Sequence, residues 1–228
     1  MQDLKILYED NHIIVVIKEP GIPVQEDKTG DLDMLTIIKK YIKEKYNKPG
    51  NVYLGLVHRL DRNTSGVMIF ARTSKAAKRL QEAMNNNGFH KSYLAIVEGN
   101  LKVSDNYILL KDKLFKDERQ NKSFVSNKGL EAMLEYKVLA NKNNKSLIDI
   151  HLLTGRHHQI RCQFSNICHP LVGDLKYGSK YNLGNYYALQ SYKLSVIHPT
   201  LKENMTFYKL DDTHEFKNFQ KELKNISQ

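Results

Sequence analysis

The segment around Asp61 holds the residue types best suited to chemistry. Asp61 stands between Arg59 and Arg62 and is followed by the turn-forming run 63–66, Asn-Thr-Ser-Gly. A positive charge at close range lowers the pKa of a carboxyl group, so we expect Asp61 to be ionised. The apolar run 67–70 that follows predicts a buried strand beside it. On residue types alone, the alternative is a solvated salt-bridge patch, which is common and contributes little to stability.

A second group of reactive residue types lies between residues 153 and 174. Five metal-ligating residues fall there: His157, His158, Cys162, Cys168 and His169. Their spacing does not match the paired short Cys and His spacings of structural zinc sites. The sequence therefore predicts no metal centre.

Three segments together resemble a known enzyme family. Residues 58–66 read His-Arg-Leu-Asp-Arg-Asn-Thr-Ser-Gly, and residues 91–99 read Lys-Ser-Tyr-Leu-Ala-Ile-Val-Glu-Gly. Residues 154–161 read Thr-Gly-Arg-His-His-Gln-Ile-Arg, with the tail His-Pro-Leu-Val-Gly-Asp at 169–174. These strings are similar to the signatures of the pseudouridine synthases of the RluA branch. The resemblance extends over residues 4–191.

The resemblance assigns roles to individual residues. It implies that Asp61 is the essential aspartate, that Tyr93 stacks on the target uracil, and that Arg161 forms an ion pair with Asp61. Stacking on an aromatic ring contributes about 1–3 kcal/mol per base, whereas a strand tyrosine taken alone usually packs in a core with its hydroxyl at the rim. The resemblance also implies that Ile160 lies against the uracil and that Arg59 fills the gap left by a flipped base.

The charge balance indicates an anionic partner. The chain has 35 Lys and Arg against 25 Asp and Glu, a net charge of +10, which favours nucleic acid. Lys75, Lys78 and Arg79 follow the catalytic segment at helical spacing and share one face. A solvated face is the simpler interpretation of three cations, but beside a catalytic loop they predict RNA phosphate contacts. His58 and Arg62 are further candidate RNA contacts.

The sequence also indicates the cellular location, the cofactor requirement and the oligomeric state that we expect. The sequence has no run of about 18 apolar residues and no secretory signal pattern, so we expect a cytoplasmic protein without a membrane partner. Its two cysteines make no disulfide framework. No Walker or Rossmann glycine loop is present, and the resemblance implies no cofactor. Without a coiled-coil pattern, we expect a monomer.

The pattern of elements predicts an α+β fold with a largely antiparallel sheet, because strands come in adjacent clusters and do not alternate strictly with helices. We expect one catalytic domain, residues 1–228, without the basic accessory RNA-binding domain that many family members carry ahead of it. The predicted helices are 34–46 with an Asp33 cap, 75–84 with a Ser74 cap, 156–165 and a closing helix from 211. The predicted strands are 4–8, 12–18, 67–70, 89–98, 106–110, 129–139, 146–153, 185–196 and 204–208, with an exposed hairpin or flap at 111–128. The strand 12–18 is apolar from 13 to 17, which predicts a central place with both faces covered.

The resemblance implies isomerisation of uridine to pseudouridine in transfer or ribosomal RNA after base flipping. Asp61 could attack C1′, add to C6 of uracil, or remove a ribose proton, and the sequence leaves these routes open. Two other classes compete with this interpretation. A hydrolase would need a second acid, for which Asp174 is available. A non-enzymatic RNA-binding protein would need only the positive charge.

Overall fold

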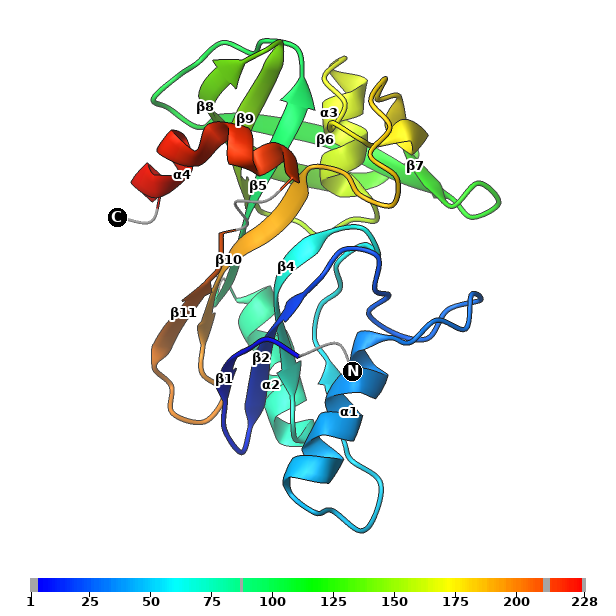
Figure 1. Ribbon diagram of the computed structural model, residues 1–228, viewed down its shortest axis with the longest axis vertical. Coiled ribbons are helices and arrows are strands. Elements are labelled where there is room, and N and C mark those ends of the chain that lie inside the picture. Colours follow the sequence, from blue (N-terminus) through cyan, green and yellow to red (C-terminus); the bar gives the residue numbers. More distant parts are fainter. Residues whose placement is uncertain (1–3, 87, 211–213, 227–228) are drawn as a thin grey trace. The chain divides into compact units, whose positions relative to one another are not determined.

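The computed structural model describes residues 4–86, 88–210 and 214–226. Their contacts divide the chain into two compact units, with unit 1 falling within Met1–His90 and Tyr192–Lys209 and unit 2 within Lys91–Ser191 and Leu210–Gln228. Each unit combines strands with helices, and the strands are largely antiparallel (Figure 1). The predicted α+β fold is therefore confirmed. The expectation of one catalytic domain stays a prediction.

Unit 1 is built on a short run of paired strands with two helices. Its strands are ordered β1-β2-β4-β10, with β3 paired to β4 and β11 paired to β10. The elements are β1 (Ile6–Glu9), β2 (Ile13–Lys18), α1 (Met34–Lys45), β3 (Gly55–Leu56), β4 (Ser65–Ala71), α2 (Ser74–Asn85), β10 (Leu189–Ile197) and β11 (Asn204–Tyr208).

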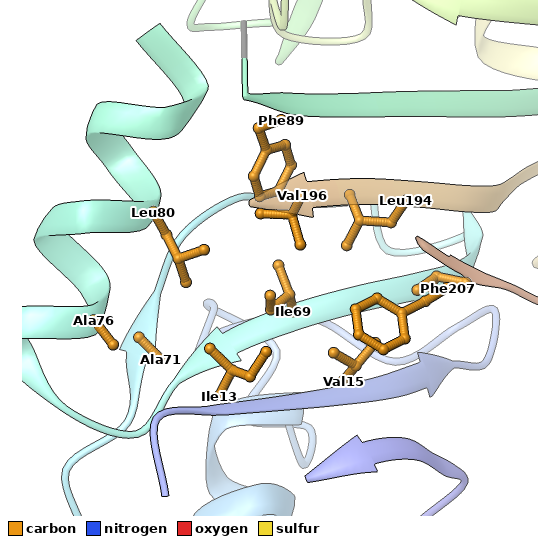
Figure 2. Close-up of a cluster of buried hydrophobic side chains, with 11 residues drawn as sticks. Ile13, Val15, Ile69, Ala71, Ala76, Leu80, Phe89, Leu194, Val196 and Phe207 are labelled. Carbon is orange, nitrogen blue, oxygen red and sulfur yellow. The ribbon is translucent and has the colours of Figure 1, made fainter. Parts of the chain in front are cut away.

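The apolar strand β2 forms the centre of unit 1. Its residues from Ile13 to Val16 are fully buried, and β2 pairs with β1 on one side and β4 on the other. Figure 2 shows the core that results, in which Ile69 of β4 lies among Leu80, Leu194 and Phe207. A strand that is apolar throughout needs both faces covered, so its predicted central place is confirmed.

Side-chain caps fix where the two helices of unit 1 begin. Asp33 accepts a hydrogen bond from the amide of Thr36 at 3.2 Å, which confirms it as the cap of α1. The prediction that Ser74 caps α2 is wrong by one residue. Thr73 is the cap, because its hydroxyl accepts from the amide of Ala76 at 3.1 Å, and Ser74 is already helical.

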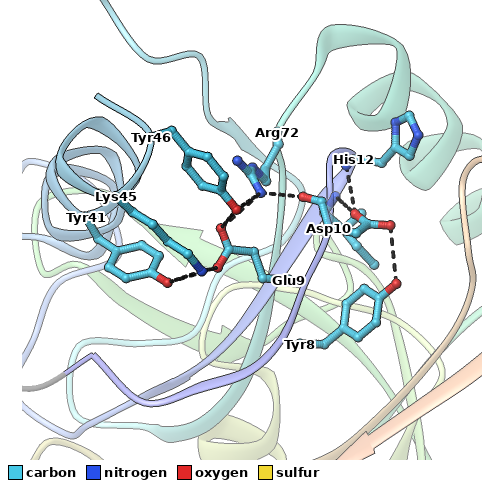
Figure 3. A network of polar contacts seen from close by, with 9 residues as sticks. Tyr8, Glu9, Asp10, His12, Tyr41, Lys45, Tyr46 and Arg72 are labelled. Carbon is cyan, nitrogen blue, oxygen red and sulfur yellow. Dashed lines mark hydrogen bonds and ion pairs between the residues drawn. The ribbon is translucent and has the colours of Figure 1, made fainter. Parts of the chain in front are cut away.

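A polar network holds α1 against the strands of unit 1. The carboxylate of Glu9 pairs with Arg72 at 3.0 Å and with Lys45 at 2.7 Å, and it accepts hydrogen bonds from Tyr41 and Tyr46 (Figure 3). Burial would raise the pKa of Glu9, but the hydrogen bonds from Lys45 and the two tyrosines hold it below its usual value. This network joins β1, α1 and the residue after β4.

Unit 2 is built on a longer antiparallel sheet in the order β5-β9-β8-β6-β7. The boundary between the units falls within β5 and β10, so each of these strands has residues in both. The elements are β5 (Phe89–Glu98), β6 (Ile108–Asp117), β7 (Lys122–Val125), β8 (Leu130–Lys142), β9 (Lys145–Leu152), α3 (Gln159–Asn166), η1 (Leu175–Tyr177), η2 (His214–Phe219) and α4 (Gln220–Ile226).

The polar stretch 111–128 contains the hairpin predicted for it. Strands β6 and β7 pair from Leu114 opposite Val125 to Asp117 opposite Lys122. The predicted closing helix is also present, as η2 and α4, although residues 211–213, where it was expected to begin, lie outside the described part of the chain.

Candidate active site

Asp61 lies in a tight turn that leads into β4. The amide of Thr64 donates to the carbonyl of Asp61 at 3.0 Å, which closes the turn over Arg62 and Asn63. The residue before it, Leu60, is buried, whereas Asp61 itself is half-buried. The carboxylate is therefore attached to a rigid main-chain turn and keeps partial access to solvent.

A buried lysine that sequence reasoning missed anchors this turn. Lys18 ends β2, is fully buried, and donates from Nζ to the carbonyls of Glu19 (3.1 Å), Arg62 (2.7 Å) and Thr64 (2.8 Å). Burial lowers the pKa of Lys18 to about 7, while the negative charges of Asp61 and Glu19 act in the opposite direction. Lys18 therefore both fixes the turn and lies within electrostatic range of the carboxylate of Asp61.

The two arginines that flank Asp61 differ in their surroundings. Arg62 donates to the carbonyl of Gly21 at 2.9 Å and forms ion pairs with Asp27 and Asp31, so its guanidinium is bound to the preceding loop. Arg59 is exposed, and within the described chain its side chain has no hydrogen-bond or ion-pair partner. Of the two, Arg59 is the side chain that remains available to an RNA.

His58 is placed as a packing residue. It is buried, its Nε2 accepts a hydrogen bond from the amide of Ile69 at 3.2 Å, and its ring meets Phe89 edge-on with centroids 5.4 Å apart. These contacts hold the start of the signature against β4. They favour a structural role for His58 over the predicted RNA contact.

The three cations of α2 are not equivalent. Lys75 and Lys78 are exposed, as a phosphate-binding role requires. Arg79 is half-buried and donates to the carbonyl of Pro199 at 2.9 Å. Arg79 thus ties α2 to the segment after β10, and only the two lysines present free cationic groups.

In unit 2, Tyr93 lies near the start of β5. Its side chain is buried, and its register partner on β9 is Ile150. Lys91 stands two residues earlier, opposite Leu152. Because side chains of a strand alternate between faces, Lys91 and Tyr93 point to the same face of the sheet.

The Thr-Gly-Arg-His-His-Gln segment folds around the side chain of Gln159. Its Oε1 accepts from the hydroxyl of Thr154 at 2.8 Å and from the amide of Arg156 at 3.0 Å, while its Nε2 donates to the carbonyl of Met133. His158 has a left-handed backbone with φ 52°, so the helix begins after it. The predicted start at Arg156 is therefore three residues too early.

Arg161 is held in unit 2 by a carboxylate. Its Nε and Nη2 donate to the two oxygens of Asp174 at 2.6 and 2.9 Å, and both side chains are buried. The rings of Tyr177 and Tyr187 lie 4.9 and 4.5 Å from the guanidinium carbon. The bidentate geometry fixes the direction of the guanidinium. The sequence analysis gave Asp174 a role only as the second acid of a hydrolase. In the structure Asp174 is instead the ion-pair partner of Arg161.

Three further observations concern the described part of the chain. No group of three or more His, Cys, Asp or Glu side chains there is placed to hold a metal ion. The rings of His157 and His158 stack 3.7 Å apart, and Nδ1 of His158 meets the hydroxyl of Tyr177 at 3.0 Å. None of the helices described is long and apolar enough to cross a bilayer.

Comparison with known families places these segments in context. Residues 12–166 match the family model for RNA pseudouridylate synthases, and this range includes Asp61, Tyr93 and Arg161. The chain belongs to this family. The resemblance to the RluA branch is thereby confirmed.

Relatives of the pseudouridylate synthase family match most of the chain. An RNA pseudouridine synthase of Bacillus subtilis named YhcT is 34% identical over 209 residues, 88% of this chain and 66% of that protein. Ribosomal large subunit pseudouridine synthase C of Buchnera aphidicola is 33% identical over 217 residues, 88% of this chain and 64% of that protein. The chain thus spans less than two thirds of the length of these two relatives.

Solved structures support the same fold. The chain is similar to the human RNA Pseudouridylate Synthase Domain Containing 4, with a TM-score of 0.75 and 23% identity, over 96% of this chain and 93% of that one. The human RNA Pseudouridylate Synthase Domain Containing 1 gives 0.73 at 21% identity, over 97% and 95%. These likenesses confirm the α+β fold of a pseudouridylate synthase.

Proposed function

We propose that the protein isomerises uridine to pseudouridine in RNA, with Asp61 as the essential aspartate. In this reaction the bond from C1′ to N1 of uracil breaks, a bond from C1′ to C5 forms, C5 loses a proton and N1 gains one. No electron is transferred to another molecule, so the chemistry needs no redox cofactor. The observation that carries the proposal is the rigid turn at Asp61, anchored by buried Lys18 within the part of the chain that matches the family.

The other predicted site residues take roles around a flipped nucleotide in this proposal. Tyr93 stacks on the uracil, Ile160 contacts it, and Arg161 pairs with the carboxylate of Asp61. The buried contacts that orient Arg161 in unit 2 support its role as a fixed cation. The exposure of Arg59 supports its role in filling the vacated stack, for which base flipping costs a few kcal/mol.

The substrate that we propose is structured RNA, transfer RNA or ribosomal RNA. A net charge of +10 supports a polyanionic substrate. Relatives named ribosomal large subunit pseudouridine synthase C and D favour large-subunit ribosomal RNA between the two. We further propose that the protein acts as a monomer in the cytoplasm.

The test compares Asp61→Asn with the wild type on transcripts of large-subunit ribosomal RNA and of transfer RNA. Pseudouridine is measured by mass spectrometry of the digested RNA. The variant keeps the size of the side chain and removes its charge, and it should lose at least about a hundredfold in turnover because the reacting oxygen is no longer anionic. Asp105→Asn is the matched control, because Asp105 is fully exposed.

The outcome that contradicts the proposal is wild-type turnover by the Asp61→Asn variant. Circular dichroism and RNA binding should stay close to those of the wild type, which separates loss of chemistry from loss of fold. A wild type that converts no uridine in either RNA would contradict the proposed activity itself.

A further inference from the structure

Lys91 occupies an unusual position beside the proposed site. It lies in β5 on the same face as Tyr93, two residues away. Its amine also borders the Thr-Gly-Arg segment, because a Cβ added at Gly155 would lie 3.5 Å from Nζ of Lys91. Lys91 therefore stands where two of the three family segments, 91–99 and 154–161, meet within unit 2.

The amine of Lys91 has no partner within the described part of the chain. Its Nζ makes no hydrogen bond and no ion pair there, although the residue is half-buried. Burial lowers the pKa of Lys91, and no neighbouring charge contributes to that shift. A desolvated cation without an acceptor is destabilising, so such a residue is retained where something else supplies the acceptor.

Lys18 shows what a buried lysine looks like when the protein itself supplies acceptors. It donates to three carbonyl oxygens, at 2.7 to 3.1 Å. Lys91 is half-buried in a functional segment and has none of these acceptors. Lys91 lies on the same face of the sheet as Tyr93, which stacks on the uracil in the proposed function. We therefore expect its acceptor to be a group of the bound substrate.

We propose that Lys91 binds a phosphate group of the RNA segment that carries the target uridine. This inference rests on the proposed function and adds a substrate contact to it. An RNA chain brings one anionic phosphate per nucleotide, and phosphate contacts fix the register of a bound strand. Lysine serves such contacts as a point charge that tolerates several directions of approach. Lys91 is thus a residue that positions the nucleotide for Tyr93.

The first experiment measures stability and RNA binding of Lys91→Met, which keeps the length of the side chain and removes its charge. The urea midpoint should rise, because the desolvated charge is gone. The Kd for a transcript of large-subunit ribosomal RNA should rise roughly tenfold, the effect of one lost charged hydrogen bond. Lys102→Met is the control, since Lys102 is an exposed lysine of unit 2, and it should change neither quantity appreciably.

The second experiment measures how binding depends on salt. Each phosphate contact contributes a slope of about 0.7 to 0.9 in log Kd against log salt concentration. The Lys91→Met variant should show a slope that is less steep by about this amount, and Lys91→Arg should restore it. Steady-state turnover should show a raised KM with kcat reduced less.

Three results would overturn the inference: an unchanged salt slope, a lowered urea midpoint with unchanged binding, or a loss confined to kcat. The last would assign Lys91 to proton transfer in place of phosphate binding. Failure of the proposed function has a different signature, since wild-type protein would then make no pseudouridine while the salt slopes of wild type and Lys91→Met still differ.

Discussion

Lys18 in unit 1 and Arg161 in unit 2 are buried basic residues with different kinds of acceptor. In unit 1, Lys18 donates to three neutral carbonyl oxygens of the main chain. In unit 2, Arg161 is paired with a carboxylate, Asp174, in a bidentate geometry. Lys18 thus fixes a turn of the main chain, whereas Arg161 is itself held by the carboxylate of Asp174.

The difference has an electrostatic reason. The turn that Lys18 anchors carries Asp61, and a second carboxylate placed there would raise the pKa of Asp61 and favour its neutral form. Carbonyl oxygens anchor the lysine without adding a negative charge. In the proposed function Arg161 is a fixed cation, and two carboxylate oxygens hold a guanidinium in one direction better than isolated carbonyls do.

The largest effect that this comparison predicts is the loss of the carboxylate in unit 2. Asp174→Asn removes the bidentate carboxylate from the buried guanidinium of Arg161, and breaking a buried pair in this way costs about 3–5 kcal/mol. The free energy of unfolding in urea measures the loss. Asp105→Asn, at a fully exposed position, should stay within about 0.5 kcal/mol of the wild type. Equal effects of the two variants would show that the buried pair has no special weight.

Much of this arrangement could be predicted from the sequence, because the deciding patterns are local. The continuous apolar run of β2 predicted a central strand, and Asp33 before an amphipathic run predicted the start of α1. Strand β5 was predicted with its observed bounds, Phe89–Glu98. The motif strings located Asp61, Tyr93 and Arg161 and indicated the family, because such strings need no knowledge of the fold.

The parts that could not be predicted depend on contacts between distant residues. Lys18 donates to carbonyls 44 and 46 positions further along the chain, and no pattern in the sequence near Lys18 predicts these contacts. A lysine at the end of an apolar strand looks like an ordinary strand end. Asp174 stood within a recognised motif, but its pairing with Arg161 depends on how the chain returns after α3. The sequence shows which residues are acidic or basic, but it does not show which of them pair in the folded chain.

The next prediction removes the amine of Lys18 in unit 1. Lys18→Met leaves three buried carbonyl groups without their donor, and unsatisfied buried acceptors cost about 1–3 kcal/mol. We expect a loss of about 2 kcal/mol at pH 8, together with reduced turnover because the turn at Asp61 loses its anchor. Urea unfolding and pseudouridine formation are the measurements. Lys39→Met, at an exposed position of α1, is the control and should leave both unchanged, and a Lys18→Met variant as stable as this control would refute the anchoring role.

A smaller effect concerns how the free energy of unfolding depends on pH through Lys18 of unit 1. Burial lowers the pKa of Lys18 to about 7 in the folded protein, against about 10.4 for an ordinary lysine. Between these values the unfolded chain binds more protons than the folded protein, so the free energy of unfolding rises with pH. From about pH 7.5 to about pH 8.5 the wild type should gain about 1 kcal/mol more than Lys18→Met. Parallel pH curves for the two proteins would contradict this.

The smallest predicted effect tests whether the cost of losing a cation follows the number of its acceptors. Among the described residues, Arg79 has one acceptor, the carbonyl of Pro199, where Lys18 has three. We expect Arg79→Met to cost about 0.5–1 kcal/mol, the net contribution of a single hydrogen bond. Lys78→Met, at an exposed position of α2, should cost nothing measurable in urea while making the salt slope of RNA binding less steep. If Lys78→Met destabilised the protein as much as Arg79→Met, the loss of an exposed charge on α2 would account for both effects. The hydrogen bond to Pro199 would then contribute nothing measurable, and the loss of stability would not follow the number of acceptors.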